Sequence, residues 1–166
     1  TLVFGWHHAV HDVICEKLSK YGPVKYTGNE SKSQKDAAFE KFTRGSEDGG
    51  TDLMLCSLWS GEGLDGLQHR CCTAVFAELD WSWARMKQCV GRLDRDGQKH
   101  PVTAYIMRSE FGLDPVMSEF LDIKKTQLVS LIGENSLGPT RKIDQSEAIR
   151  RVARGFLDGS RSVRRA

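Results

Sequence analysis

Two arginines stand three positions apart in residues 88–98, which read QCVGRLDRDGQ. A guanidinium group makes paired hydrogen bonds to phosphate oxygens and stabilises the charge that develops during phosphoryl transfer. At this spacing Arg92 and Arg95 can share one face of a helix. Taken alone, such arginines are more often solvated surface residues. The spacing therefore leaves two interpretations open, a solvated helix end and a site that holds a polyphosphate.

A glycine-rich turn is the second candidate. Residues 60–66 read SGEGLDG and follow a run of apolar residues. Glycines in such a turn allow the backbone to approach a phosphate or a base closely. A tight loop that binds nothing would have the same composition. The turn by itself therefore favours neither interpretation.

Histidines and tryptophans supply weaker candidates. His7 and His8 follow an apolar run. No carboxylate or cysteine nearby completes a ligand set, so we expect no metal site. Trp81 and Trp83 could stack on a base, although packing in a core is the more usual role of tryptophan.

The composition is that of one globular domain. The chain has 166 residues, of which 39% are hydrophobic and 28% charged, with a formal net charge of +2. This balance is ordinary and does not indicate a nucleic-acid partner. The charge is unevenly distributed, however, because eight basic residues face three acidic ones after Pro139. This basic tail could contact phosphates, and a solvated helix with a frayed end would look the same.

Five cysteines are present, and none forms a CxxC pair. Their odd number and the length of the chain argue against a disulfide scaffold, and their spacing argues against zinc. We therefore expect a reducing, intracellular setting. The sequence contains neither a signal peptide nor a long apolar span, so no membrane partner is expected. Because the chain begins without Met inside an apparent strand, we expect it to be a piece of a longer protein.

Apolar runs and helical spacing alternate along the chain. Apolar runs predict strands at residues 2–6, 24–27, 52–58, 73–79 and 102–108. Helical spacing predicts helices at residues 7–21, 30–42, 83–93, 114–132 and 144–157, with Ser31 or Ser33 able to cap the second. This order predicts an α/β fold with a parallel sheet between helices. Ligands of such sheets bind at the carboxyl ends of the strands, where the glycine-rich turn falls.

Two motifs that hold nucleotides in ATPases are absent from the sequence. There is no GxxxxGK[ST] phosphate loop and no DExx-type acidic pair after a strand. Without them the chain has no evident means of holding Mg²⁺ and the β- and γ-phosphates. If the chain serves an ATPase, it supplies half of the active site.

Taken in order, the segments resemble the second RecA-like lobe of a superfamily 2 helicase of the SNF2 type. The resemblance covers residues 2–125 and is most specific in motif VI. That motif is matched at every defining position, namely Gln88, Gly91, Arg92, Arg95, Gly97 and Gln98. The final GQ pair is similar to SNF2-type proteins and differs from the GRxGR of DEAD-box RNA helicases.

Other segments carry the resemblance with some departures. Motif IV corresponds to LVFGWHHAVHDVI, and motif V corresponds to DLMLCSLWSGEGLDGL. The segment AVFAELDWSWARMKQ matches a strand followed by Trp and, seven residues later, Gln. Lys35 stands where the family usually has Arg, and Trp83 replaces a frequent Pro. Trp59, Ser60 and Asp65 differ from the usual motif V.

The resemblance implies a domain organisation and an activity. Residues 1–133 would form a RecA-like lobe of the P-loop NTPase type without its phosphate loop, and residues 134–166 a basic helical extension. The full protein would be a DNA-dependent ATPase and translocase, bacterial or phage in origin and cytoplasmic, or nuclear if eukaryotic. ATP and Mg²⁺ would be held mainly by an N-terminal RecA-like lobe of the same polypeptide, so the chain alone would be inactive.

The resemblance also implies roles for individual residues. Arg92 and Arg95 would act as arginine fingers on the γ-phosphate, and Gln88 would couple the nucleotide state to lobe closure. The nucleotide would lie against Gly61, Gly63, Asp65 and Gly91. The backbone of duplex DNA would contact Trp6, His7, Gly28 and Ser57, largely without regard to base sequence.

Two alternative functions stay open. The chain could be a non-catalytic nucleic-acid-binding module that uses the basic tail. It could also be a lobe of an RNA helicase, which differs from the first hypothesis in the polymer that stimulates ATP hydrolysis.

Overall fold

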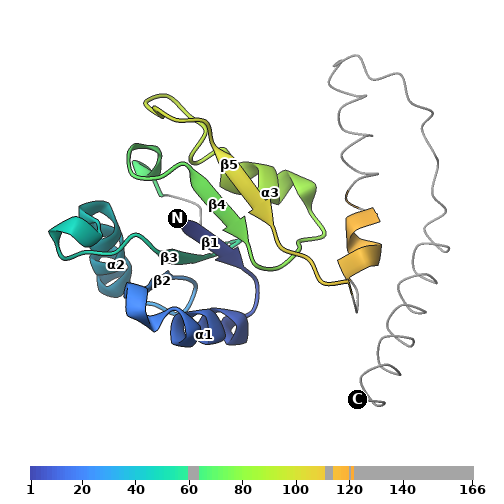
Figure 1. Cartoon of the computed structure of the whole chain (residues 1–166), viewed down its shortest axis with the longest axis horizontal. Coiled ribbons are helices and arrows are strands. Elements are labelled where there is room, and N and C mark those ends of the chain that lie inside the picture. The colour runs from blue at the N-terminus through green and yellow to red at the C-terminus, as the bar shows by residue number, and fades with distance from the viewer. Residues whose placement is uncertain (60–63, 111–113, 120, 122–166) are drawn as a thin grey trace. The chain divides into compact units, whose positions relative to one another are not determined.

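The computed structural model describes residues 1–59, 64–110, 114–119 and 121. The chain divides into two compact units, one comprising residues 1–78 and 84–107 and the other residues 79–83 and 108–166. The first unit holds the sheet and its helices (Figure 1). The boundary predicted at residue 133 and the helix predicted at residues 144–157 lie outside the described residues.

A five-stranded parallel sheet forms the centre of the first unit (Figure 1). Its strands are β1 (Leu2–Gly5), β2 (Val24–Tyr26), β3 (Met54–Ser57), β4 (Thr73–Phe76) and β5 (Thr103–Ile106), in the spatial order β2-β3-β1-β4-β5. Every adjacent pair is parallel, so the carboxyl ends of all the strands lie at one edge of the sheet. The predicted α/β fold with a parallel sheet is confirmed.

The inner strands carry the core. Leu2, Met54 and Leu55 are fully buried, and the rings of Phe4 and Phe76 stack with their centroids 5.3 Å apart. Strands covered by helices on both faces must be apolar throughout, which is why β1 and β3 read as continuous apolar runs. β5, the outermost strand beside β4, is exposed along its whole length.

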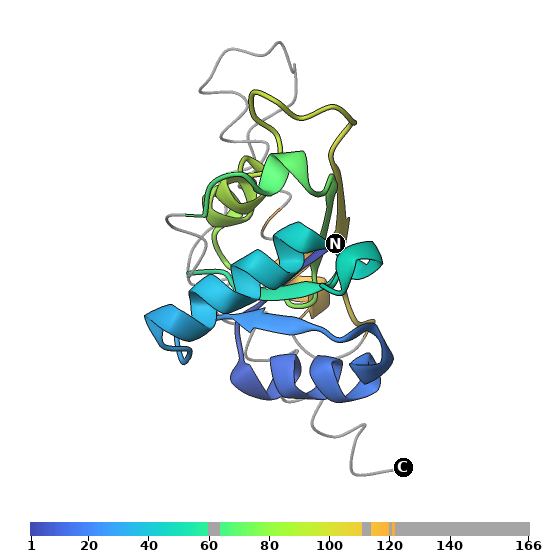
Figure 2. The same cartoon turned by 90° about the vertical axis from the view of Figure 1, so that its left-hand side faces the viewer.

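Helices cover both faces of the sheet. α1 (His8–Lys17) lies on one face, and α2 (Lys32–Arg44) and α3 (Trp83–Val90) lie on the other, as right-handed crossovers require (Figures 1 and 2). Three short 3₁₀ turns lie between these elements: η1 (Ser19–Tyr21), η2 (Ser46–Asp48) and η3 (Leu67–His69). Residues 114–119 and 121 are helical, as predicted for the start of the helix at residues 114–132. Within the described residues, no helix combines the length and the apolar character that crossing a bilayer requires.

The start of α2 is fixed by a capping box. The Ser31 side chain accepts a hydrogen bond from the backbone N–H of Gln34 at 3.3 Å, and the Gln34 side chain accepts one from the backbone N–H of Ser31 at 2.8 Å. Of the two predicted cap residues, Ser31 is therefore the one that caps. The helix then buries Ala38 and Phe42, one turn apart.

Candidate functional site

The carboxylate of Glu78 joins the loops that follow β1 and β4. One oxygen accepts the backbone N–H groups of Trp6 and His7 at 2.7 and 2.8 Å, and the other lies 2.6 Å from His7 Nδ1. Burial by itself raises the pKa of this carboxyl. The hydrogen bonds from the His7 side chain and from the two backbone amides outweigh burial and bring the pKa below its ordinary value. Glu78 is therefore ionised at neutral pH and fixes the turn after β1.

His11 fills the space beneath this turn. The residue is 1% exposed, and a Cβ atom at Gly5 would come within 2.8 Å of its Nε2 atom. Only glycine at the end of β1 therefore lets the ring pack here without displacement. Burial lowers the pKa of His11, and the charge of Glu78 acts in the opposite direction with the smaller effect. His11 is thus a neutral packing residue at pH 7.

Two exposed tryptophans and a half-buried arginine form a group at the same edge, here named the Trp–Arg cluster (Trp6, Trp59 and Arg85). The indole centroids of Trp6 and Trp59 are 5.8 Å apart, and the guanidinium carbon of Arg85 lies 3.7 Å from the Trp59 centroid. Trp6 is 42% exposed and Trp59 is 60% exposed. Sequence reasoning named Trp6 as a DNA contact but treated Trp59 only as a departure from motif V and passed over Arg85. The available signal was that Trp6 comes directly after β1 and Trp59 two residues after the end of β3.

The second ion pair of this edge joins motif V to motif VI. Arg95 Nη1 lies 2.8 Å from Asp65 Oδ1, and the two side chains are 45% and 79% exposed. The same carboxylate oxygen accepts the backbone N–H of Gly66 at 3.0 Å. Residues predicted separately for nucleotide binding and for catalysis are therefore brought together in the folded chain.

The two arginines do not lie on one helical face, contrary to the sequence prediction. α3 ends at Val90 rather than at residue 93, and Arg92 and Arg95 lie in the turns that follow. Turn-type backbone bonds continue past the helix, from the N–H of Arg92 to the carbonyl of Cys89 at 3.3 Å and from the N–H of Asp94 to the carbonyl of Val90 at 3.0 Å. Gly91 weakens helical continuation at this point. Arg92 is consequently half-buried, whereas Arg95 is exposed.

The GQ pair at the end of motif VI braces this turn. Gly97 has a φ of +92°, a backbone conformation that favours glycine. The Gln98 side chain donates hydrogen bonds to the carbonyls of Cys71 at 3.0 Å and Leu93 at 3.2 Å. Leu93 is fully buried between the two arginines. Gly97 and Gln98 therefore stabilise the turn that carries Arg92 and Arg95, here named the arginine turn.

The remaining predicted residues have varied positions. Ser57 ends β3 directly opposite Gly5, beside the turn that carries Trp6 and His7. Gly28 is exposed in the bend after β2, and Gln88 and Gly91 are exposed at the end of α3. Gly61 and Gly63 lie outside the described residues. No group of three His, Cys, Asp or Glu side chains in the described residues is arranged to hold a metal ion.

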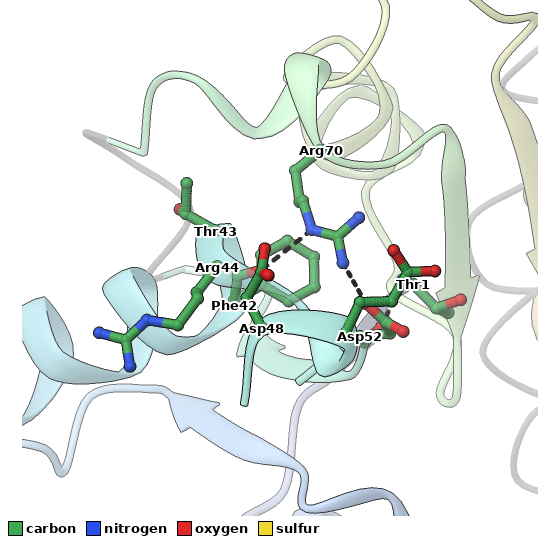
Figure 3. A pocket seen from close by; sticks show the side chains of 8 residues that line it. Thr1, Phe42, Thr43, Arg44, Asp48, Asp52 and Arg70 are labelled. Carbon is green, nitrogen blue, oxygen red and sulfur yellow. Dashed lines mark hydrogen bonds and ion pairs between the residues drawn. The ribbon is translucent and has the colours of Figure 1, made fainter. Parts of the chain in front are cut away.

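A pocket lies beside Thr1, which precedes β1 at the amino ends of the strands (Figure 3). Its volume is about 410 Å³. Arg70 points into it and bonds to the Asp52 carboxylate and, at 3.2 Å, to the carbonyl oxygen of Phe42. This arginine is engaged within the chain, and none of the predicted site residues lines the pocket. The candidate site is therefore the edge of the sheet at which the strands have their carboxyl ends, here named the carboxyl edge.

No protein-family model matches the chain. Among solved structures, the chain is similar to the crystal structure of the C-terminal part of the Fun30 ATPase domain, with a TM-score of 0.63 and 15% sequence identity. The chain folds as a RecA-like lobe. The match covers 93% of this lobe and 46% of the solved chain, so the lobe spans about half the length of the protein that it matches. At this identity the likeness shows the fold, and it gives no support to the expected bacterial or phage origin.

The bonds of Glu78 predict a pH dependence of stability. Because the folded pKa of Glu78 lies below its unfolded value, its contribution is complete above the unfolded pKa, near 4.3 to 4.5, and is lost as the pH falls through the folded pKa. Glu78→Gln should therefore unfold at a lower urea concentration than the parent chain at pH 7. The gap between the two should narrow as the pH falls below about 4.5 and should close once the pH is below the folded pKa.

Glu40→Gln is the matched control for this experiment. It removes an exposed carboxylate that pairs with Arg44 at 2.9 Å on the surface of α2. Surface pairs of this type contribute about 0.5 kcal/mol or less. A gap between Glu78→Gln and the parent that persists unchanged to pH 3 would contradict the role given to the Glu78 charge.

Proposed function

We propose that this chain is the second motor lobe of an SNF2-type DNA-dependent ATPase that moves along DNA. ATP binds between this lobe and a first RecA-like lobe of the same polypeptide. Three findings support the proposal: the RecA-like fold, the likeness to the C-terminal part of the Fun30 ATPase domain, and the ordered motifs of the sequence. The observation that carries it is the contact of 2.8 Å between Arg95 of motif VI and Asp65 of motif V at the carboxyl edge.

Arg92 and Arg95 act as arginine fingers. An oxygen of a carboxylate and an oxygen of a phosphate make similar demands on a guanidinium group, so the geometry that suits Asp65 also suits a γ-phosphate. The Arg95–Asp65 pair is exposed and contributes only about 0–1 kcal/mol. Arg95 can therefore exchange Asp65 for the phosphate at little cost. Asp65 holds the guanidinium extended until that exchange.

ATP and Mg²⁺ are held mainly by the first lobe. The sequence lacks a phosphate loop, and the described residues lack a set of metal ligands, whereas arginine side chains fit the phosphate oxygens. Mg²⁺, when bound, neutralises charge on the phosphates. The lobe contributes the cations of the arginine turn and the backbone of Gly61, Gly63 and Gly91. Gln88, exposed on α3 just before the arginine turn, links the nucleotide state to lobe closure.

DNA lies along the same edge. Trp6, His7 and Ser57 follow or end neighbouring strands, and Gly28 lies in the exposed bend beyond β2. Contacts from such positions reach the sugar–phosphate backbone, and they do not depend strongly on base sequence. Opening and closing of the two lobes, gated by ATP, then moves the protein along the duplex.

Removal of the exposed finger tests the catalytic role. In the full-length protein, Arg95→Ala should lower the kcat of DNA-stimulated ATP hydrolysis by about 10³-fold or more, with a modest loss of ATP binding, because the guanidinium acts on the transition state. Arg44→Ala removes another exposed arginine, paired with Glu40 on α2, and should leave kcat unchanged. An unchanged kcat in Arg95→Ala would remove Arg95 from the finger role.

Neutralisation of Asp65 tests the exchange. Asp65→Asn should lower the KM for ATP by up to about fivefold, the value of a surface ion pair, because the phosphate no longer competes with a carboxylate for Arg95. The kcat should stay within about twofold of the parent value. Asp36→Asn, which removes an exposed charge from α2, serves as the charge-matched control. A fall in kcat as large as that of Arg95→Ala would show that Asp65 acts in catalysis itself.

A further inference from the structure

We propose that the Trp–Arg cluster binds an unpaired DNA base beside the duplex. This property would make the lobe responsive to junctions between single- and double-stranded DNA. The inference rests on the proposed function, because it takes DNA to be the polymer that lies along the carboxyl edge.

The cluster is assembled from three elements. Trp6 follows β1, Trp59 follows β3, and Arg85 lies in α3. β1 and β3 are adjacent, so the two indoles extend from paired strand ends. The guanidinium carbon of Arg85 lies 3.7 Å from the Trp59 centroid and 5.6 Å from the Trp6 centroid. The Glu78 carboxylate accepts the backbone N–H of Trp6 at 2.7 Å, so the backbone that carries one of the two indoles is held before any ligand arrives.

Exposure marks the cluster as a surface for a partner. Trp59 remains 60% exposed although Arg85 stacks on it, which leaves room for another planar group. Trp6 beside it is 42% exposed. Neighbouring exposed indoles form an apolar patch, and such patches on soluble domains commonly bind a partner. A preformed stack also costs less to order on binding than flexible side chains do.

A nucleobase fits this surface in shape and in charge. Its flat face stacks on indole and guanidinium groups alike, and the attached phosphates complement the charge of Arg85. The nearby carboxylate of Glu78 is already engaged by three hydrogen bonds, which limits its repulsion of a phosphate. Bases inside a duplex stack on one another and offer only their edges. The cluster can therefore hold only a base that has left the duplex.

The test measures binding of the full-length protein to two DNA ligands at one salt concentration. One is a blunt duplex, and the other is the same duplex with a single-stranded overhang. Trp59→Ala should lower affinity for the overhang ligand by about 5- to 150-fold, the value of one base stack, and affinity for the blunt duplex by less than about twofold. Trp59→Phe retains a ring and should keep most of the preference for the overhang. An overhang of abasic nucleotides should lose the preference with the parent protein.

Tyr21→Ala is the matched control. Tyr21 is 56% exposed, and Lys20 Nζ lies 4.8 Å from its ring centroid. Tyr21 precedes β2, at the amino ends of the strands and not at the carboxyl edge. This variant should leave both affinities unchanged.

Four outcomes would overturn the inference. If the abasic overhang binds the parent as tightly as the normal one, or if Trp59→Ala weakens both ligands equally, no base stacks here, although DNA binding itself stands. If Trp59→Ala instead alters ATP hydrolysis measured without DNA and leaves both affinities intact, the cluster packs against the first lobe. If the parent binds neither ligand, the proposed function fails together with this inference.

Discussion

The hydrogen bonds of the half-buried Glu78 carboxylate are the interaction on which the carboxyl edge depends. Parallel strands bring their loops to one edge, but loops have no fixed conformation without further bonds. Glu78 supplies these bonds by accepting two backbone N–H groups and contacting a histidine ring across the loops after β1 and β4. Charge-assisted hydrogen bonds to backbone amides are among the stronger polar interactions in a protein. The backbone position of Trp6, one member of the Trp–Arg cluster, is fixed by this one side chain.

A second arrangement, built on motif VI, presents cations at the same edge. Buried Leu93 and the donor groups of Gln98 secure the turn, while Gly97 adopts the left-handed conformation that lets the chain reverse. Arg95 then projects from a rigid support, as an electrostatic group must if it is to act on a transition state without reorganisation. Its partner Asp65 comes from motif V, so the contact couples the two motifs physically.

The sheet was predictable because its physical signal is local. Continuous apolar runs such as residues 52–58 arise wherever both faces of a strand are covered, and the alternation of strands and helices then fixes the class of fold. The end of α3 was placed three residues too late because the apolar spacing continues to Leu93, which is buried by tertiary contacts after the helix has ended. Pattern alone cannot separate a buried turn residue from a buried helix residue.

The contacts of the site were less predictable than its residues. Arg95 and Asp65 could each be chosen from their motifs, but their meeting depends on the path of the chain between motifs V and VI. The Trp–Arg cluster depends on the strand order, which places β1 beside β3 rather than beside β2. No short-range pattern carries that information. Contacts between residues that follow different strands of a parallel sheet can therefore be identified only from the folded structure.

In the proposed function, this lobe completes an ATP site whose phosphate-binding half belongs to another lobe. The most direct measurement compares ATP hydrolysis, with and without duplex DNA, by the 166-residue chain alone and by the full-length protein that contains it. We expect no turnover by the chain alone and DNA-stimulated turnover by the full-length protein. DNA-stimulated hydrolysis by the chain alone would contradict it.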